Sequence, residues 1–159
     1  MNLTKFVGFT TLIIGLSFTA QAQTTPEAGS FGIRANVGGQ NAIEIPYMLN
    51  ESFSIAPYLG LNAIQDATTN FSFGVSPRFY IDGNEDISTY INGNLGFQNT
   101  SFSNTNSSAF DVDLGVGYGA EFFFNPSFSL SGDVNLNARF GDNANALRTS
   151  ASVAVSYYF

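Results

Sequence analysis

Eight segments of this 159-residue chain alternate apolar and polar side chains with a period of two. Successive side chains of an extended strand point to opposite faces, so this period predicts strands that are apolar on one face only. Residues typical of turns, mainly Gly, Asn, Asp, Ser and Pro, separate the segments, and no segment has a convincing helical period. The predicted strands span residues 31–37, 43–49, 53–61, 71–81, 87–97, 110–122, 128–140 and 147–159.

Charged residues are too few to cover an ordinary water-facing surface. They make up 11% of the chain, against 15% for the aromatic residues, whereas about 25–35% of a soluble surface is charged. Disorder is excluded because Phe, Ile, Leu and Val are frequent. No apolar run beyond the N-terminal region has the length of a membrane-spanning helix. The apolar strand faces therefore need either a closed core or a membrane around them.

Two prolines lie inside predicted strands. Pro57 and Pro77 belong to neighbouring strands, and proline has no N–H to donate to a strand ladder. We therefore expect bulges or rim positions at these two residues. The segments 31–37 and 43–49 are slightly short for a tilted crossing of a membrane, which takes about nine to eleven residues.

The N-terminal residues have the pattern of a secretory signal peptide. Met1–Lys5 carries the only lysine, an apolar run follows, and Thr19-Ala20-Gln21-Ala22 offers an A-x-A cleavage site. The run is too short for a spanning helix, and an N-terminal membrane anchor is the alternative. We expect a signal peptide at 1–22, a short disordered lead at 23–29 and one barrel domain at 30–159.

The period alone does not say which face of a closed barrel points inward. A soluble, lipocalin-like barrel places the apolar face inside, and a membrane barrel places it outside. The polar face consists mainly of small residues, which suit the narrow interior of an eight-stranded barrel. The aromatic residues of the apolar face cluster near strand ends around an aliphatic middle, as in the two aromatic girdles of a membrane barrel.

The charges of the strands all lie on the polar face, as lipid contact would require. Because the positive and negative groups nearly cancel, we predict that they form an interior charge network that closes the lumen. The predicted members are Arg34, Glu44, Arg78, Asp111, Asp113, Glu121, Asp133, Arg139 and Arg148.

The turn at residues 125–127 predicts one part of this network in detail. A tight turn there places Asp113 opposite Arg139 on paired strands. Matching the faces on the next hairpin allows Arg139 to lie opposite Arg148. With Asp111 two residues from Asp113, we expect one cluster of two acids and two bases at the outer end of the lumen.

The last segment ends in an aromatic residue, with Val155, Tyr157 and Phe159 on its apolar face. This strand resembles the closing strand of gram-negative outer-membrane barrels, although the usual glycine of that end motif is replaced here, Ala154 being the nearest small residue. The whole pattern resembles the OmpA/OmpX-like family. The resemblance implies an all-β, eight-stranded antiparallel up-and-down transmembrane β-barrel in the outer membrane.

In that family the end segment is read by the barrel-assembly machinery. The resemblance therefore implies that Val155, Tyr157 and Phe159 form an assembly signal. It also implies that outer-membrane lipid surrounds the barrel, and that periplasmic chaperones and the assembly machinery are its partners during biogenesis. We expect a monomer.

The chain has no cysteine and no histidine. Disulfides, thiolate metal sites and a lipid anchor on cysteine are therefore excluded. Its twelve acidic residues against five basic ones exclude nucleic-acid binding through phosphates. Barrel enzymes of the outer membrane resemble one another in using histidine, the usual general base, so we predict no enzyme and no cofactor.

Two motifs offer alternatives to a purely structural interior. Asp111 and Asp113 could form an acid/base pair or a weak cation site, but arginines on the same face favour ion pairs. The glycine-rich stretch 115–119 (GVGYG) lies in mid-strand with no following helix, so it does not form a phosphate loop. We predict a structural or surface-interaction protein. The alternatives are a porin-like small-solute channel and a soluble secreted lipocalin-like binder.

Overall fold

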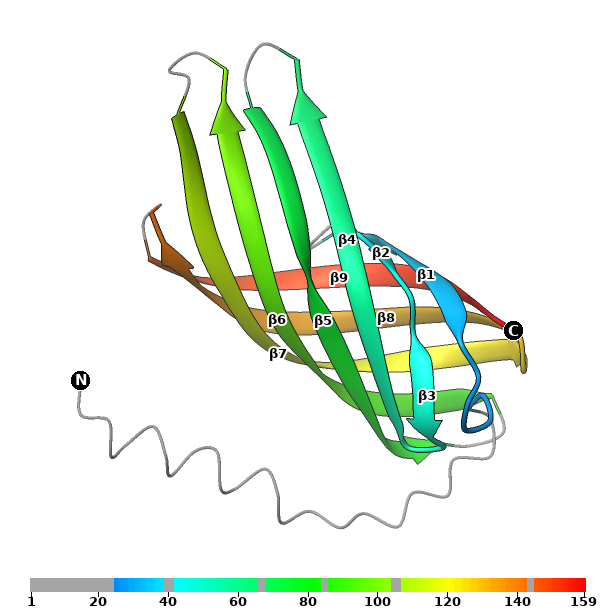
Figure 1. Cartoon of the computed structure of the whole chain (residues 1–159). Helices are drawn as coiled ribbons and strands as arrows, with labels where there is room; N and C mark the ends of the chain where they lie inside the picture. Colours follow the sequence, from blue (N-terminus) through cyan, green and yellow to red (C-terminus); the bar gives the residue numbers. More distant parts are fainter. Residues whose placement is uncertain (1–24, 39–41, 66–67, 84–85, 104–106, 143–144) are drawn as a thin grey trace.

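The computed structural model describes residues 25–38, 42–65, 68–83, 86–103, 107–142 and 145–159. Over these residues it contains nine strands in one antiparallel sheet (Figure 1). The strands are β1 (Gly32–Val37), β2 (Ile43–Glu44), β3 (Tyr47–Asn50), β4 (Phe53–Ile64), β5 (Thr68–Gly83), β6 (Ile87–Phe102), β7 (Ser107–Asn125), β8 (Phe128–Gly141) and β9 (Ala146–Tyr158). None of the described segments is a helix long and apolar enough to cross a membrane.

The sheet closes on itself to form a barrel. Its order is β2-β1-β9-β8-β7-β6-β5-β4-β3, and β2 also pairs with β4, which joins the two edges. β2 and β3 are two parts of one crossing, separated only by Ile45 and Pro46. The chain is therefore a closed, eight-stranded antiparallel barrel, and the predicted fold class is confirmed.

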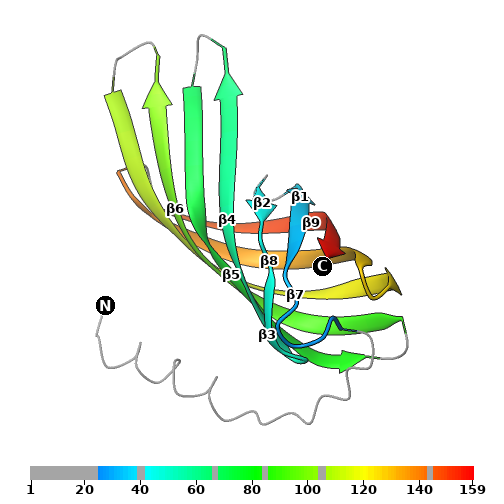
Figure 2. The same ribbon diagram turned by 45° about the vertical axis from the view of Figure 1, so that its right-hand side comes forward.

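The two ends of the barrel differ. We call the end with the connections after β3, β5 and β7 and with Phe159 the turn end, and the opposite end the loop end. At the loop end the hairpins β4–β5 and β6–β7 rise well beyond β1, β2 and β9 (Figures 1 and 2). Pairing in these hairpins continues to Ile64 opposite Thr68 and to Phe102 opposite Ser107.

The barrel exposes its apolar side chains and buries its charged ones. Val116 and Val134 are 53% and 62% exposed on the outer face. Arg34 and Glu121 are both 0% exposed, in the lumen. The apolar face thus points outward, as the small polar-face residues and the aromatic pattern predict, and not inward as in a lipocalin-like barrel.

Prolines lie beside two of the interruptions in strand pairing, and three further register shifts, at Met48/Asn50, Tyr80/Asp82 and Phe123/Asn125, lie near the turn end. The gap between β2 and β3 contains Pro46 and lies beside Pro57 of β4, whose carbonyl accepts a hydrogen bond from the N–H of Ile45 at 2.9 Å. In the β5–β6 ladder the register resumes at Arg78 opposite Asn92 after the proline at position 77. Pro57 and Pro77 each interrupt the pairing on one side only, because they have no N–H to donate there, and both stay paired in the β4–β5 ladder.

The predicted signal peptide, residues 1–22, lies outside the described residues. The described part of the lead, 25–29, differs from the predicted disorder because it packs on the turn end. The Thr25 hydroxyl donates to the Glu51 carbonyl at 2.7 Å, Pro26 is buried, and the Gly29 N–H donates to the Met48 carbonyl at 2.8 Å. One side-chain and one backbone hydrogen bond to β3 and its turn give this short segment a defined path.

Candidate functional site: the polar lumen

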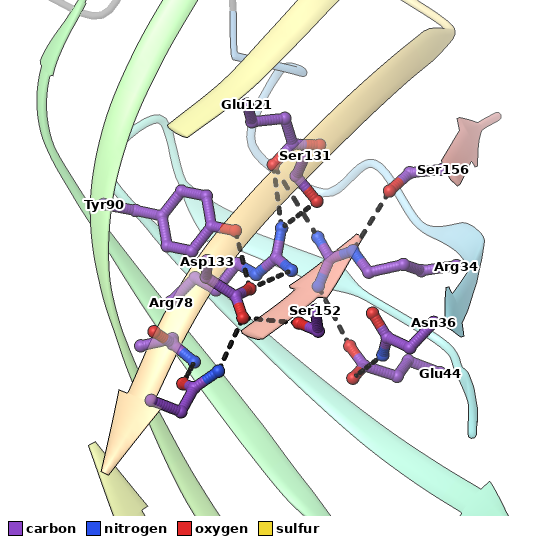
Figure 3. A network of polar contacts seen from close by, with 12 residues as sticks. Arg34, Asn36, Glu44, Arg78, Tyr90, Glu121, Ser131, Asp133, Ser152 and Ser156 are labelled. Atoms are coloured by element: carbon purple, nitrogen blue, oxygen red, sulfur yellow. Dashed lines mark hydrogen bonds and ion pairs between the residues drawn. The ribbon is translucent and has the colours of Figure 1, made fainter. Parts of the chain in front are cut away.

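A cluster of buried ion pairs fills the turn end of the lumen (Figure 3). Arg34 of β1 is its first cation. Its Nη1 lies 3.0 Å from Glu44 Oε2, its Nη2 donates to the Tyr158 hydroxyl at 2.9 Å, and its Nε donates to Ser156 Oγ at 3.0 Å. Three strands, β1, β2 and β9, are held together through this one guanidinium.

Glu121 of β7 is the central anion of the cluster. Its Oε2 lies 3.0 Å from Arg78 Nη1 and 4.0 Å from Arg34 Nη2. The hydroxyls of Tyr80 and Tyr158 donate to its two oxygens at 2.8 and 3.2 Å. A carboxylate with no solvent exposure is thus matched by two guanidinium groups and several hydroxyl donors, as burial of a charge requires.

Arg78 of β5 connects Glu121 to a third acid. Its Nη2 lies 3.7 Å from Asp133 Oδ2, and its guanidinium carbon lies 4.3 Å from the centre of the Tyr90 ring. The Tyr90 hydroxyl donates to Asp133 at 2.9 Å, and Asn135 donates to the same carboxylate at 2.6 Å. We call Arg34, Glu44, Arg78, Glu121 and Asp133, with Tyr80, Tyr90 and Tyr158, the turn-end cluster.

A second, separate ion pair lies nearer the loop end. Arg139 binds Asp113 with two parallel hydrogen bonds, Nε to Oδ1 at 2.8 Å and Nη2 to Oδ2 at 2.9 Å. Asp113 lies opposite Arg139 in the β7–β8 ladder, as the turn at 125–127 predicts. Asp111 is buried and lies opposite Gly141.

The predicted position of Arg148 is wrong. In the β8–β9 ladder Arg148 lies opposite Asn137, and Arg139 lies opposite Ala146. The hairpin is shifted by two residues from the predicted register, which leaves every side chain on its predicted face. Arg148 is exposed and makes no ion pair with any described acid, so the expected cluster of two acids and two bases is reduced to the Asp113–Arg139 pair and its neighbour Asp111.

Glycines of β7 make room for polar side chains from both neighbouring strands. Gly117 lies between Asn92 of β6 and Asn135 of β8 in the two ladders. A Cβ at Gly117 would come within 2.0 Å of Asn135 Oδ1, whereas without it the Asn92 amide reaches across and donates to Asn135 at 2.7 Å. In the stretch 115–119 the glycines leave space in which side chains of β6 and β8 contact each other across β7. The stretch lies in mid-strand and is not a phosphate loop.

The same arrangement repeats above and below Gly117. Gly119 lies between Tyr90 and Asp133, and Gly115 lies between residues 94 and 137. Each of these glycines has a side-chain atom of a neighbouring strand where its Cβ would stand. Polar contacts between β6 and β8 across the glycines of β7 thus repeat along the lumen, and we call each of these contacts a rung.

Between the turn-end cluster and the loop end the lumen holds a cavity of about 490 Å³. Asp133 and Arg78 lie at its turn end, and Asp113, Arg139 and Arg148 line it nearer the loop end.

The charge pattern of the sequence identified the acids and arginines of the lumen wall. It did not identify the tyrosines of the cluster or the asparagines of the rungs, whose only signal was their place on the polar face. No group of acidic residues in the described part of the chain could hold a metal ion.

Comparison with known proteins gives similarity in structure alone. No family model matches the sequence, and no curated protein matches it. The N-terminal β-barrel domain of OprF from Pseudomonas aeruginosa is 18% identical with a TM-score of 0.61, over 83% of this chain and 98% of that one. Neisserial surface protein A is 18% identical with a TM-score of 0.58, over 82% of this chain and 95% of that one.

Both of these structures are small outer-membrane barrels of eight strands. At this level of identity the similarity shows the fold alone. The chain therefore has the fold of the small outer-membrane barrel family that its sequence resembles.

Proposed function

We propose that this protein is an integral outer-membrane β-barrel without enzymatic activity, with a structural or surface-interaction role and a lumen closed by the turn-end cluster. The observation that carries the proposal is the exposure of large apolar side chains around a closed barrel whose charges are buried. A surface of this kind is stable in hydrocarbon and not in water.

Aromatic side chains on the outer face support a membrane with two interfaces. At the turn end the rings of Phe31 and Phe159 stack at 5.2 Å. Toward the loop end Phe73 and Phe97 stack at 5.3 Å, and Phe97 lies 6.1 Å from Phe110. Aromatic girdles of this kind sit at the headgroup level on each side of a bilayer.

Cell fractionation tests the location. The full chain, expressed in a gram-negative host, should appear in the outer-membrane fraction and change its gel mobility on heating. Recovery in the soluble periplasmic fraction would favour the lipocalin-like alternative and overturn the proposal.

The closed lumen is supported by the two guanidinium groups, three carboxylates and three tyrosine rings of the turn-end cluster, all of them largely removed from solvent. The competing function is a small-solute channel, favoured by the cavity on the loop side of the cluster. Planar-bilayer recordings distinguish the two. The purified barrel should give no steady conductance, and a steady conductance would establish the channel instead.

The assembly signal at Val155, Tyr157 and Phe159 belongs to this proposal. The outer face of β9 ends at these residues, and the Phe159 N–H donates to the Phe31 carbonyl at 2.8 Å beside the ring stack. The same proposal includes a monomeric barrel, surrounded by lipid, that depends on periplasmic chaperones and the assembly machinery during biogenesis.

A further inference from the structure

The cavity at the loop end of the lumen has a wall rich in uncharged hydrogen-bonding groups. Seven asparagines and Gln98 contribute their amides, and several serines add hydroxyls. A volume of about 490 Å³ lies within the range of about 300–1,000 Å³ found for small-molecule sites. Sites for apolar ligands are lined mainly by aliphatic and aromatic side chains, so this wall points to a polar ligand.

The amides are held in place by the rungs of the barrel. Asn92 and Asn135 meet above Gly117 through a hydrogen bond of 2.7 Å. Asn137 donates to Ser150 of β9 at 3.0 Å, which fixes its amide and leaves its oxygen facing the lumen side of Gly115. Groups fixed in this way lose little conformational entropy when a ligand binds.

The charges of the wall are already paired within the protein. Glu44 is paired with Arg34, Asp133 with Arg78, and Asp113 with Arg139. Arg148 makes no pair with a described acid, but it is exposed, where a single ion pair contributes little to binding. The cavity therefore offers hydrogen bonds in both directions and almost no uncompensated charge.

We propose that this cavity binds one small, uncharged, hydroxyl-rich solute of the saccharide class, which enters from the loop end. Each hydroxyl of such a solute donates and accepts, as each amide of the wall does. The inference rests on the proposed function in one respect, because the turn-end cluster forms the floor of the cavity.

Calorimetry on the folded full-length barrel tests this proposal. The barrel is kept in a zwitterionic detergent, because alkyl glycosides would compete, and is titrated with glucose and with sucrose. Glucuronate and glycine betaine serve as charged and hydroxyl-free probes. At least one of the two sugars should bind at a single saturable site, and both other probes should bind more weakly.

Two variants on one strand locate the site. Asn94→Leu removes an amide from the wall at nearly constant volume and should weaken sugar binding by about tenfold or more. Asn99→Leu makes the same change on the outer face of β6, where Asn99 lies opposite Phe110, and should leave binding unchanged. Heat-modifiable gel mobility shows that each variant is folded.

Three results would overturn the proposal: no saturable binding of either sugar to the folded barrel, glucuronate or betaine binding as tightly as the sugars, or equal binding by Asn94→Leu and the unaltered chain. A separate measurement tests whether the turn-end cluster closes the lumen. If it does not, glucose would pass through the barrel, and proteoliposomes that contain the barrel would swell in glucose.

Discussion

Glu121 is the side chain on which the turn-end cluster depends most. Its carboxylate lies within 4.0 Å of both Arg34 and Arg78. Glu121→Ala leaves two buried guanidinium groups facing each other, and removing one partner of a buried ion pair costs about 3–5 kcal/mol. We expect a loss of this size in the free energy of unfolding, measured by urea titration of the barrel in lipid vesicles.

Glu27→Ala is the control for this measurement, because Glu27 is exposed at the turn end and should change the free energy of unfolding by less than about 0.5 kcal/mol. Asp113→Ala should give an intermediate loss, since the Asp113–Arg139 pair is partly open to solvent. Equal stabilities for Glu121→Ala and Glu27→Ala would contradict the part assigned to the cluster.

The glycines of β7 and β8 differ in what surrounds them. A Cβ at Gly117 would approach Asn135 Oδ1 to 2.0 Å and the Val134 carbonyl oxygen to 2.7 Å, whereas a Cβ at Gly132 has no atom nearer than 3.8 Å. Gly117→Ala should therefore destabilise the barrel by about 1–3 kcal/mol through overpacking. Gly132→Ala should be neutral or stabilising by up to about 1 kcal/mol, because it restricts the unfolded chain. Urea titration of the two variants in lipid vesicles checks the difference, and a larger loss at Gly132 would contradict the assignment of faces.

The strand faces could be predicted from sequence, but the registers only in part. Alternation fixes which side chains share a face, and a shift of two residues changes no face. The β7–β8 register was predictable because its turn is short, whereas β8–β9 is joined by a longer connection, and Arg148 was placed two residues from its true partner.

The long hairpins β4–β5 and β6–β7 and the break between β2 and β3 are harder to predict from the sequence. β6 and β7 continue to Phe102 and back from Ser107, through Asn, Ser and Thr residues that do not alternate with apolar ones. Outside a membrane both faces of a strand are wetted, so the signal that marks the other strands disappears there. The break at Ile45–Pro46 follows from Pro46 and from Pro57 on the adjacent strand, whereas the sequence pattern predicts an irregularity at only Pro57 of these two.

The membrane embedding of the whole barrel is tested by charge on its outer face. Val116 lies in the middle of β7 and is 53% exposed there. Val116→Arg should weaken folding into lipid vesicles by about 2–4 kcal/mol, because a cation at the bilayer midplane is costly. Asn99→Arg, on the outer face nearer the loop end, should change folding by about 0–1 kcal/mol. A barrel in water would tolerate both changes equally, so equal free energies in vesicles would refute the embedding.

The proposed assembly signal at Phe159 can be separated from the contribution of this residue to packing. Phe159 stacks on Phe31 at 5.2 Å and its N–H bonds to the Phe31 carbonyl, so it contributes to the folded wall. If it is also part of the assembly signal, deletion of Phe159 should lower the outer-membrane yield strongly while the purified variant still refolds in vesicles. Phe31→Ala removes the same ring stack but keeps the terminal aromatic residue. It should reduce stability in vesicles to a similar degree and leave the yield in cells nearly unchanged. Equal yields from the two variants would mean that Phe159 acts only through packing, and the assembly signal would then lie elsewhere in the chain.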